Sequence, residues 1–305
     1  RIPDKEPNTM ASIATNAADG VHSASPPQSA WELRSLSALM AAEIVGLDLT
    51  EPLDADTRGR LHQAFLDHQL LVFRDQDLTK EQQVAFTEQF GTLERHTARN
   101  KGTNDLPLVH IVNNLGEDGK PMGKVRSDMW HTDKSFRPAP SMATILHAIT
   151  LPPDGGDTVF VNMYAAFEGL STERQAEIRD LKVVHSWRLS RENEGREMSA
   201  EELADAPDNT HPLARIHPET SRAAIFAGMH ASHIEGWPFE KGRALILELE
   251  AHATQPQFLY RHTWRPGDML MWDNRCLLHR AEANFDAAKY PRVLHRTCLR
   301  GTPTS

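Results

Sequence analysis

The distribution of apolar positions predicts many short strands and few helices. Residues 70–73 form a continuous apolar run between polar residues, which is typical of a buried strand. One or two strands are expected within residues 31–50, and a hairpin is expected where 211–216 and 223–226 flank a turn that contains Pro218. The other predicted strands are 108–112, 143–149, 158–160, 183–187, 258–264, 268–272 and 293–299.

Helices are indicated where an apolar stripe follows a capping residue. Asp54 is expected to cap a helix that runs to about His68, and Thr79 a second helix that ends near Gly91. Pro238 is expected to begin a third helix with an apolar stripe. Two shorter helical segments are expected at 164–169 and 171–180.

Strands that outnumber helices, without strict alternation, predict a mainly β fold with peripheral helices, either a β-sandwich or a jelly roll. We expect one domain over residues 31–305. Residues 1–30 are rich in Asn, Ala, Ser and Pro and are interpreted as a disordered tail, in which 1–9 are added residues before a start at Met10. Residues 96–128 form a long basic loop that is interpreted as a lid.

Composition excludes several classes of protein. The formal net charge of -9 argues against general nucleic-acid binding, and no apolar run approaches the ~20 residues of a membrane-spanning helix. Two cysteines are too few for a disulfide framework or a cysteine zinc site. A cytoplasmic location is therefore the expectation.

The candidate chemistry centres on His131 and Asp133. Residues two apart on an extended strand point to the same side, so the imidazole and the carboxylate are expected to be adjacent metal ligands. His279, beyond the predicted strand 268–272, is the strongest candidate for a third ligand. Two His and one carboxylate suit non-haem Fe(II) and leave positions open for a co-substrate and oxygen.

Two other pairs could compete for this role. His217 and Glu219 are separated by a proline that breaks the alternation of a strand, which makes them the poorer pair. His233 and Glu235 are harder to dismiss, although no strand is predicted around them.

Arg292 and Arg296 follow the third candidate ligand in the sequence and carry positive charges. On a strand they would share one face but stand roughly 13 Å apart, so we expect them to serve different anions. The planar fork of arginine suits a carboxylate, although a surface salt bridge is the commoner fate of an arginine.

Together these segments resemble the taurine dioxygenase (TauD/TfdA) family of Fe(II)- and 2-oxoglutarate-dependent dioxygenases. The resemblance spans about 32–300, and the stretch 230–236 is most similar to the 2,4-dichlorophenoxyacetate dioxygenase branch. The motifs that carry it are Trp130-His131-Thr132-Asp133, Gly155-Gly156-Asp157-Thr158, Trp272-Asp273-Asn274-Arg275 with His279, and Arg292 with Arg296.

The resemblance implies a double-stranded β-helix core, cupin-like in architecture, and assigns roles to residues. His131, Asp133 and His279 would bind iron, and Arg292 with Thr158 would bind 2-oxoglutarate. Arg296 and His96 would contact the primary substrate. The segment from His279 to Arg292 is longer than in the taurine and phenoxyacetate enzymes, which predicts an extended turn at 284–290.

The expected reaction consumes 2-oxoglutarate and O2, releases succinate and CO2, and hydroxylates a small anionic substrate. Asp133 favours oxygenation, because halogenating relatives lack this carboxylate. An aryloxyalkanoate, an N-acyl amino acid, a sulfonate or an alkyl sulfate is expected, its apolar body near Phe136, Trp130 and Met229, with His230 also at the substrate.

Two alternatives are a cupin-like protein that holds a metal without turnover and a zinc hydrolase with the same three ligands. Family members are commonly dimers or tetramers, which suggests a homo-oligomer.

Overall fold

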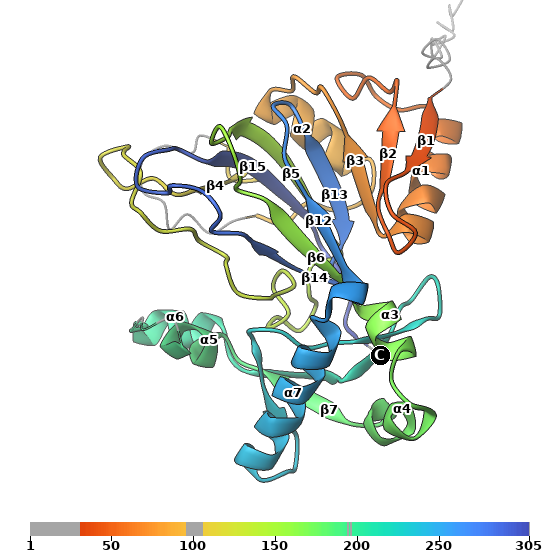
Figure 1. Ribbon diagram of the computed structural model, residues 1–305, viewed down its shortest axis with the longest axis vertical. Coiled ribbons are helices and arrows are strands. Elements are labelled where there is room, and N and C mark those ends of the chain that lie inside the picture. Colours follow the sequence, from red (N-terminus) through yellow and green to blue (C-terminus); the bar gives the residue numbers. More distant parts are fainter. Residues whose placement is uncertain (1–30, 96–105, 194, 196, 305) are drawn as a thin grey trace, which may run out of the picture.

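The largest sheet of the protein has seven strands (Figure 1). The computed structural model describes residues 31–95, 106–193, 195 and 197–304. The strand order of this sheet is β1-β2-β3-β13-β5-β15-β4, and its pairs are antiparallel except for β2 with β3. Its strands are β1 (Glu32–Ser35), β2 (Ala42–Val45), β3 (Leu70–Phe73), β4 (His110–Asn113), β5 (Ala143–Thr150), β13 (Met269–Asp273) and β15 (Val293–Leu299).

Both faces of this sheet are buried, because successive side chains of its central strands enter different cores. In β13, Leu270 and Trp272 belong to one core, called the inner core here, and Met269 and Met271 belong to the other, called the outer core. The predicted apolar run 70–73 is likewise divided between the two cores, which explains why it shows no alternation.

The helices α1 (Ala55–His68) and α2 (Lys80–Glu88) pack into the outer core. The Asp54 carboxylate accepts from the backbone N–H of Thr57, and Thr79 forms a capping box with Gln82, so both predicted caps are confirmed. The predicted end at Gly91 is wrong, because α2 ends at Glu88.

A second sheet, in the order β12-β6-β14, contributes to the inner core together with the large sheet. The pair of sheets forms the expected double-stranded β-helix, or jelly roll. Its strands are β6 (Thr158–Asn162), β12 (Leu259–His262) and β14 (Leu277–Ala281). Strand β14, which carries His279, was not predicted from the sequence.

The segment between β6 and β12 forms the remaining, lower part of the molecule (Figure 1). The predicted hairpin is present as β9 and β10, although residues 211–212 of its predicted first arm belong instead to β8, which pairs with β7. The helix after Pro238 is present as α7. Helices α5 and α6 and strand β11 were not predicted. The elements are α3 (Met163–Glu168), α4 (Thr172–Arg179), β7 (Lys182–His185), α5 (Trp187–Asn193), α6 (Ala200–Asp205), β8 (Asn209–Pro212), β9 (Ala214–Ile216), β10 (Ala223–Ile225), β11 (Ala231–Ile234), α7 (Phe239–Ala253) and the 3-10 helix η1 (Pro256–Phe258).

Over the described residues, no helix has the length and apolar character needed to cross a membrane.

A buried histidine connects this lower part to the turn that carries Asp133. The His185 ring on β7 stacks on Phe226 at 4.9 Å between centroids, and its Nδ1 lies 3.0 Å from the Ser135 hydroxyl. Burial, and next the neighbouring His211, lower the pKa of His185 to about 3. The folded protein therefore keeps this imidazole neutral over the whole physiological range.

This burial predicts a specific loss of stability in mild acid. Below the ordinary pKa of 6.5, the unfolded chain takes up a proton at His185 that the folded chain does not. Between pH 7 and pH 5 this residue should lower the free energy of unfolding by about 2 kcal/mol. Denaturant unfolding of the metal-free protein at both pH values measures the loss.

The His185→Gln variant provides the comparison, because it removes the titrating group. Its loss of stability between pH 7 and pH 5 should be smaller than that of the wild type by about the same 2 kcal/mol. Equal losses in the two proteins would show that His185 does not contribute.

Candidate metal centre and active-site pocket

Two backbone hydrogen bonds join His131 to His279. The His131 N–H donates to the His279 carbonyl at 3.0 Å, and the His279 N–H donates back at 2.8 Å. His279 is fixed in β14, where it pairs with Phe160 of β6. The two imidazoles therefore lie side by side, with ring centroids 4.2 Å apart.

The environment of both rings suits metal ligands. The His131 Nδ1–H donates to the Met129 carbonyl at 2.8 Å, which leaves Nε2 for a metal. Burial lowers the pKa of His131 and of His279. Metal coordination requires the neutral imidazole, so burial keeps these side chains in the form that can bind.

The Asp133 carboxylate reaches the same point from a turn. His131 forms only an isolated bridge, and a turn begins at Asp133 and continues through Lys134, whose φ is 54°. The expectation that an extended strand aligns the pair is therefore wrong, although the two side chains do converge. Asp133 Oδ2 lies 4.0 Å from His279 Nε2.

Arg296 holds the other oxygen of this carboxylate. Its guanidinium donates to Asp133 Oδ1 at 2.8 Å and lies 2.8 Å from His110 Nδ1. Burial alone would raise the pKa of Asp133, but the Arg296 charge, with His279 and His131, lowers it below its ordinary value. The carboxylate is thus ionised and able to bind a cation.

The ligand atoms of His131, Asp133 and His279 all lie within 4.8 Å of one another, and all three residues are buried. In the part of the chain that the structure describes, no other group of three His, Cys, Asp or Glu side chains converges in this way. The donor set and its burial fit a non-haem iron ion.

The competing pairs are occupied elsewhere. His217 Nε2 lies 3.0 Å from an Asp273 carboxylate oxygen, and Glu219 accepts from Arg275 at 2.5 Å. His233 lies on β11, contrary to the absence of a predicted strand, and its Nδ1 lies 3.0 Å from the Ser232 hydroxyl.

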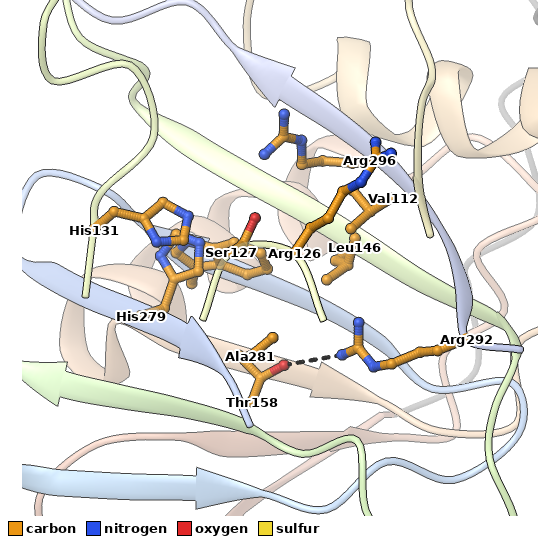
Figure 2. Close-up of a pocket in the computed structure, with 11 residues that line it drawn as sticks. Val112, Arg126, Ser127, His131, Leu146, Thr158, His279, Ala281, Arg292 and Arg296 are labelled. Atoms are coloured by element: carbon orange, nitrogen blue, oxygen red, sulfur yellow. Dashed lines mark hydrogen bonds between the residues drawn. The ribbon is translucent and has the colours of Figure 1, made fainter. Parts of the chain in front are cut away.

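A pocket of about 380 Å³, counted with the solvent at its mouth, opens beside the two imidazoles. Figure 2 shows His131 and His279 at one end and Arg292 at the other. Arg126 and Arg296 also line it. Its remaining lining residues are Val112, Ser127, Leu146, Thr158, Trp272 and Ala281.

The far end of the pocket is built around Arg292. Its Nε–H donates to the Gly156 carbonyl at 2.9 Å, and Nη2 lies 3.4 Å from the Thr158 hydroxyl (Figure 2). The Trp264 indole N–H also donates to this hydroxyl, at 3.0 Å. Burial lowers the pKa of Arg292 to about 10, so the side chain stays charged at neutral pH.

The segment before Arg292 clamps the Gly155–Gly156 turn. The Asn284 Oδ1 accepts from the Gly156 N–H at 2.8 Å, and Nδ2 donates to the Asp157 carboxylate at 3.0 Å. Gly155 has a φ of 75°, and a Cβ on it would overlap with the Asn284 carbonyl oxygen. Asn284 therefore fixes the loop whose carbonyl orients Arg292.

The remaining predicted site residues are distributed as follows. His96 lies outside the described residues. Phe136 and His230 lie beside the ligands but do not line the pocket, and they form an aromatic group in which Phe136 is 5.0 Å from His230 and 4.6 Å from Trp187. His230 carries a pKa well below its ordinary value, first because of burial and next because of His131.

Several residues that contact the site were not predicted from the sequence. His110 contacts Arg296, and Thr144 donates a hydrogen bond to Asp133. Ser127 lines the pocket. Each lies in a segment without a recognisable motif, so only the folded arrangement identifies them.

The chain belongs to the TauD/TfdA family, because the family model "Taurine catabolism dioxygenase TauD, TfdA family" matches residues 32–298. The protein is therefore a 2-oxoglutarate-dependent dioxygenase that uses Fe(II), 2-oxoglutarate and O2, and this class excludes the metal-storing and zinc-hydrolase alternatives.

Relatives of known activity support the same class. The alpha-ketoglutarate-dependent 2,4-dichlorophenoxyacetate dioxygenase of Cupriavidus pinatubonensis is 37% identical over 276 residues, which cover 87% of this chain and 96% of that protein. The (S)-phenoxypropionate/alpha-ketoglutarate-dioxygenase of Sphingobium herbicidovorans is 33% identical and covers 90% of this chain and 97% of its own length.

A solved structure also resembles this chain throughout. The crystal structure of AAD-2 in complex with Mn(II) and N-oxalylglycine has a TM-score of 0.81 and 37% sequence identity, and it covers 90% of this chain and 99% of that one.

The geometry predicts that loss of His279 abolishes tight metal binding. In a titration of the metal-free protein with Mn(II), His279→Ala should weaken binding by more than the roughly 10- to 100-fold typical of outer contacts. His233→Ala is the matched control, because this histidine belongs to a competing pair, and it should bind Mn(II) as the wild type does. If His233→Ala weakened Mn(II) binding more than His279→Ala did, then His233 and not His279 would be the metal ligand.

Proposed function

We propose that His131, Asp133 and His279 bind Fe(II) and that the protein hydroxylates a small anionic organic substrate, with release of succinate and CO2. The observation that carries the proposal is the convergence of three buried ligand atoms at one end of an arginine-lined pocket. The presence of Asp133 favours oxygenation over halogenation.

Arg292 and Thr158 are proposed to bind the distal carboxylate of 2-oxoglutarate. Arg292 is only 6% exposed, and among the described residues the nearby carboxylate of Asp157 acts on its charge without forming a salt bridge with it. A buried cation without a directly paired anion is unfavourable, and a bound carboxylate would relieve this cost. This charge is also the reason to prefer 2-oxoglutarate to a neutral ligand.

The primary substrate is proposed to be an aryloxyalkanoate or an N-acyl amino acid. Relatives that are named for 2,4-dichlorophenoxyacetate and (S)-phenoxypropionate support the first. Arg296 is proposed to contact the substrate anion in addition to Asp133, since its guanidinium lines the pocket. His96, Phe136 and His230 are proposed as further substrate contacts.

The protein residues position the reactants. Bound Fe(II), 2-oxoglutarate and O2 supply the oxidising chemistry. Arg292 and Arg296 orient anionic groups, and the side chains of Val112, Leu146 and Trp272 give the pocket apolar lining. A cytoplasmic location and a dimeric or tetrameric assembly remain predictions.

Succinate release tests the proposed reaction directly. The protein is supplied with Fe(II), 2-oxoglutarate and O2 and with a panel of aryloxyalkanoates, N-acyl amino acids, sulfonates and alkyl sulfates. Succinate should rise above the substrate-free background with one carboxylate class, in step with hydroxylated product. Absence of turnover with every anion, while neutral analogues are turned over, would reject the substrate proposal.

Arg292→Lys tests the co-substrate contact. Lysine keeps the charge but loses the planar fork, so at least one charge-assisted hydrogen bond, worth about 1.5–3 kcal/mol, is lost. The KM for 2-oxoglutarate should rise roughly 10- to 100-fold. Arg261→Lys, at a half-exposed arginine that contacts Asp157 and Glu282, should leave this KM unchanged. An unchanged KM in Arg292→Lys would remove Arg292 from the co-substrate site.

A further inference from the structure

A chain of hydrogen bonds ends on the carboxylate of Asp133. The Thr144 hydroxyl donates to Asp133 Oδ2 at 2.6 Å, and the Asn274 side-chain amide donates to the Thr144 hydroxyl at 2.9 Å. The Trp272 indole N–H donates to Asn274 Oδ1 at 3.0 Å. All four residues are buried, so water does not replace these contacts.

The direction of this chain follows from donor chemistry. An indole nitrogen only donates, so it fixes the oxygen of the Asn274 amide toward Trp272 and the NH2 group toward Thr144. The Thr144 oxygen accepts that bond, and its own proton is directed to Asp133. The Thr144 hydroxyl is therefore oriented as a hydrogen-bond donor to the Asp133 carboxylate.

The β register places these groups together. Thr144 lies on β5 opposite Trp272 of β13, and it shares the inner face of β5 with Leu146, which lines the pocket. Asn274 directly follows β13. Its backbone carbonyl also accepts from the Thr132 hydroxyl at 2.8 Å, so the same residue holds the segment before Asp133.

The two oxygens of Asp133 are thus held from opposite sides. Thr144 donates to Oδ2, the oxygen that lies 4.0 Å from His279 Nε2, and Arg296 donates to Oδ1. Without such donors, the carboxylate could rotate about the χ angles of the Asp133 side chain. The two donors remove that rotation.

We propose that Thr144 and Asn274 are positioning residues of the metal centre, which fix the orientation of the Asp133 carboxylate and thereby set the affinity for the metal. The inference rests on the proposed role of Asp133 as a ligand. Outer contacts of this kind typically change metal affinity by roughly 10- to 100-fold.

Mn(II) affinity is the direct measurement, because it does not depend on turnover. The metal-free wild type and the variants Thr144→Val, Thr144→Ser and Asn274→Asp are titrated with Mn(II), and free Mn(II) is followed by electron paramagnetic resonance. Valine matches the shape of threonine without its hydroxyl, serine keeps the hydroxyl, and aspartate replaces the NH2 donor of Asn274 with an oxygen.

Two further variants separate positioning from a general effect on folding. Thr297→Val removes another buried hydroxyl, which lies on β15 and contacts the Thr87 hydroxyl at 2.8 Å. Asp133→Ala removes the ligand itself. Thermal unfolding in EDTA reports whether each variant is folded before metal is added.

Thr144→Val and Asn274→Asp should raise the Kd for Mn(II) roughly tenfold or more, whereas Thr144→Ser and Thr297→Val should stay within about twofold of the wild type. The proposal is overturned if Thr144→Val binds as the wild type does while Asp133→Ala loses binding, or if Thr297→Val is weakened equally. Wild-type affinity in Asp133→Ala would instead reject the proposed ligand set, and the positioning role with it.

Discussion

The backbone bridge between His131 and His279 is the constraint on which the active site depends. These residues come from segments that lie far apart in the sequence, and two hydrogen bonds fix their Cα positions and bring their rings to 4.2 Å. One partner is anchored in β14, which pairs along its length with β6. The rigid sheet thereby determines where the less regular segment with Asp133 lies, which agrees with the rule that precise sites are built on regular elements.

The two ends of the pocket differ in how their arginine charges are compensated. At the end with His131 and His279, the Arg296 cation is compensated by Asp133. At the other end, no acidic side chain among the described residues forms a salt bridge with Arg292, and burial lowers its pKa to about 10 although the nearby Asp157 carboxylate opposes this shift. An elongated molecule with a carboxylate at one end and a metal-binding group at the other is therefore complementary to this pocket in a single orientation.

Much of the fold could be predicted because local chemistry dictates it. Asp54 and Thr79 cap their helices, and residues 293–299 form β15 over the range expected from the sequence. The convergence of His131, Asp133 and His279 was also predicted correctly, although for a partly wrong reason, since Asp133 lies in a turn. Strand β14 was missed, because its apolar residues follow β13 after a turn of only a few residues.

The contacts around the candidate ligands could not be predicted in the same way. Thr144 was placed correctly in a strand, but its position beside Asp133 depends on the register of β5 against β13, which involves residues far apart in sequence. The roles of His96, Phe136 and His230 at the substrate stay predictions.

The clamp of Asn284 on the Gly155–Gly156 turn restricts how this enzyme can be recombined with its relatives. A chimera whose turn at 284–290 lacked Asn284 would leave the Gly156 N–H and the Asp157 carboxylate without the Asn284 amide. Conversely, a chimera that kept Asn284 but received a bulkier residue at Gly155 would force the two loops apart. The two segments thus form one exchangeable module, and crossover points for gene shuffling should leave both on the same parental sequence.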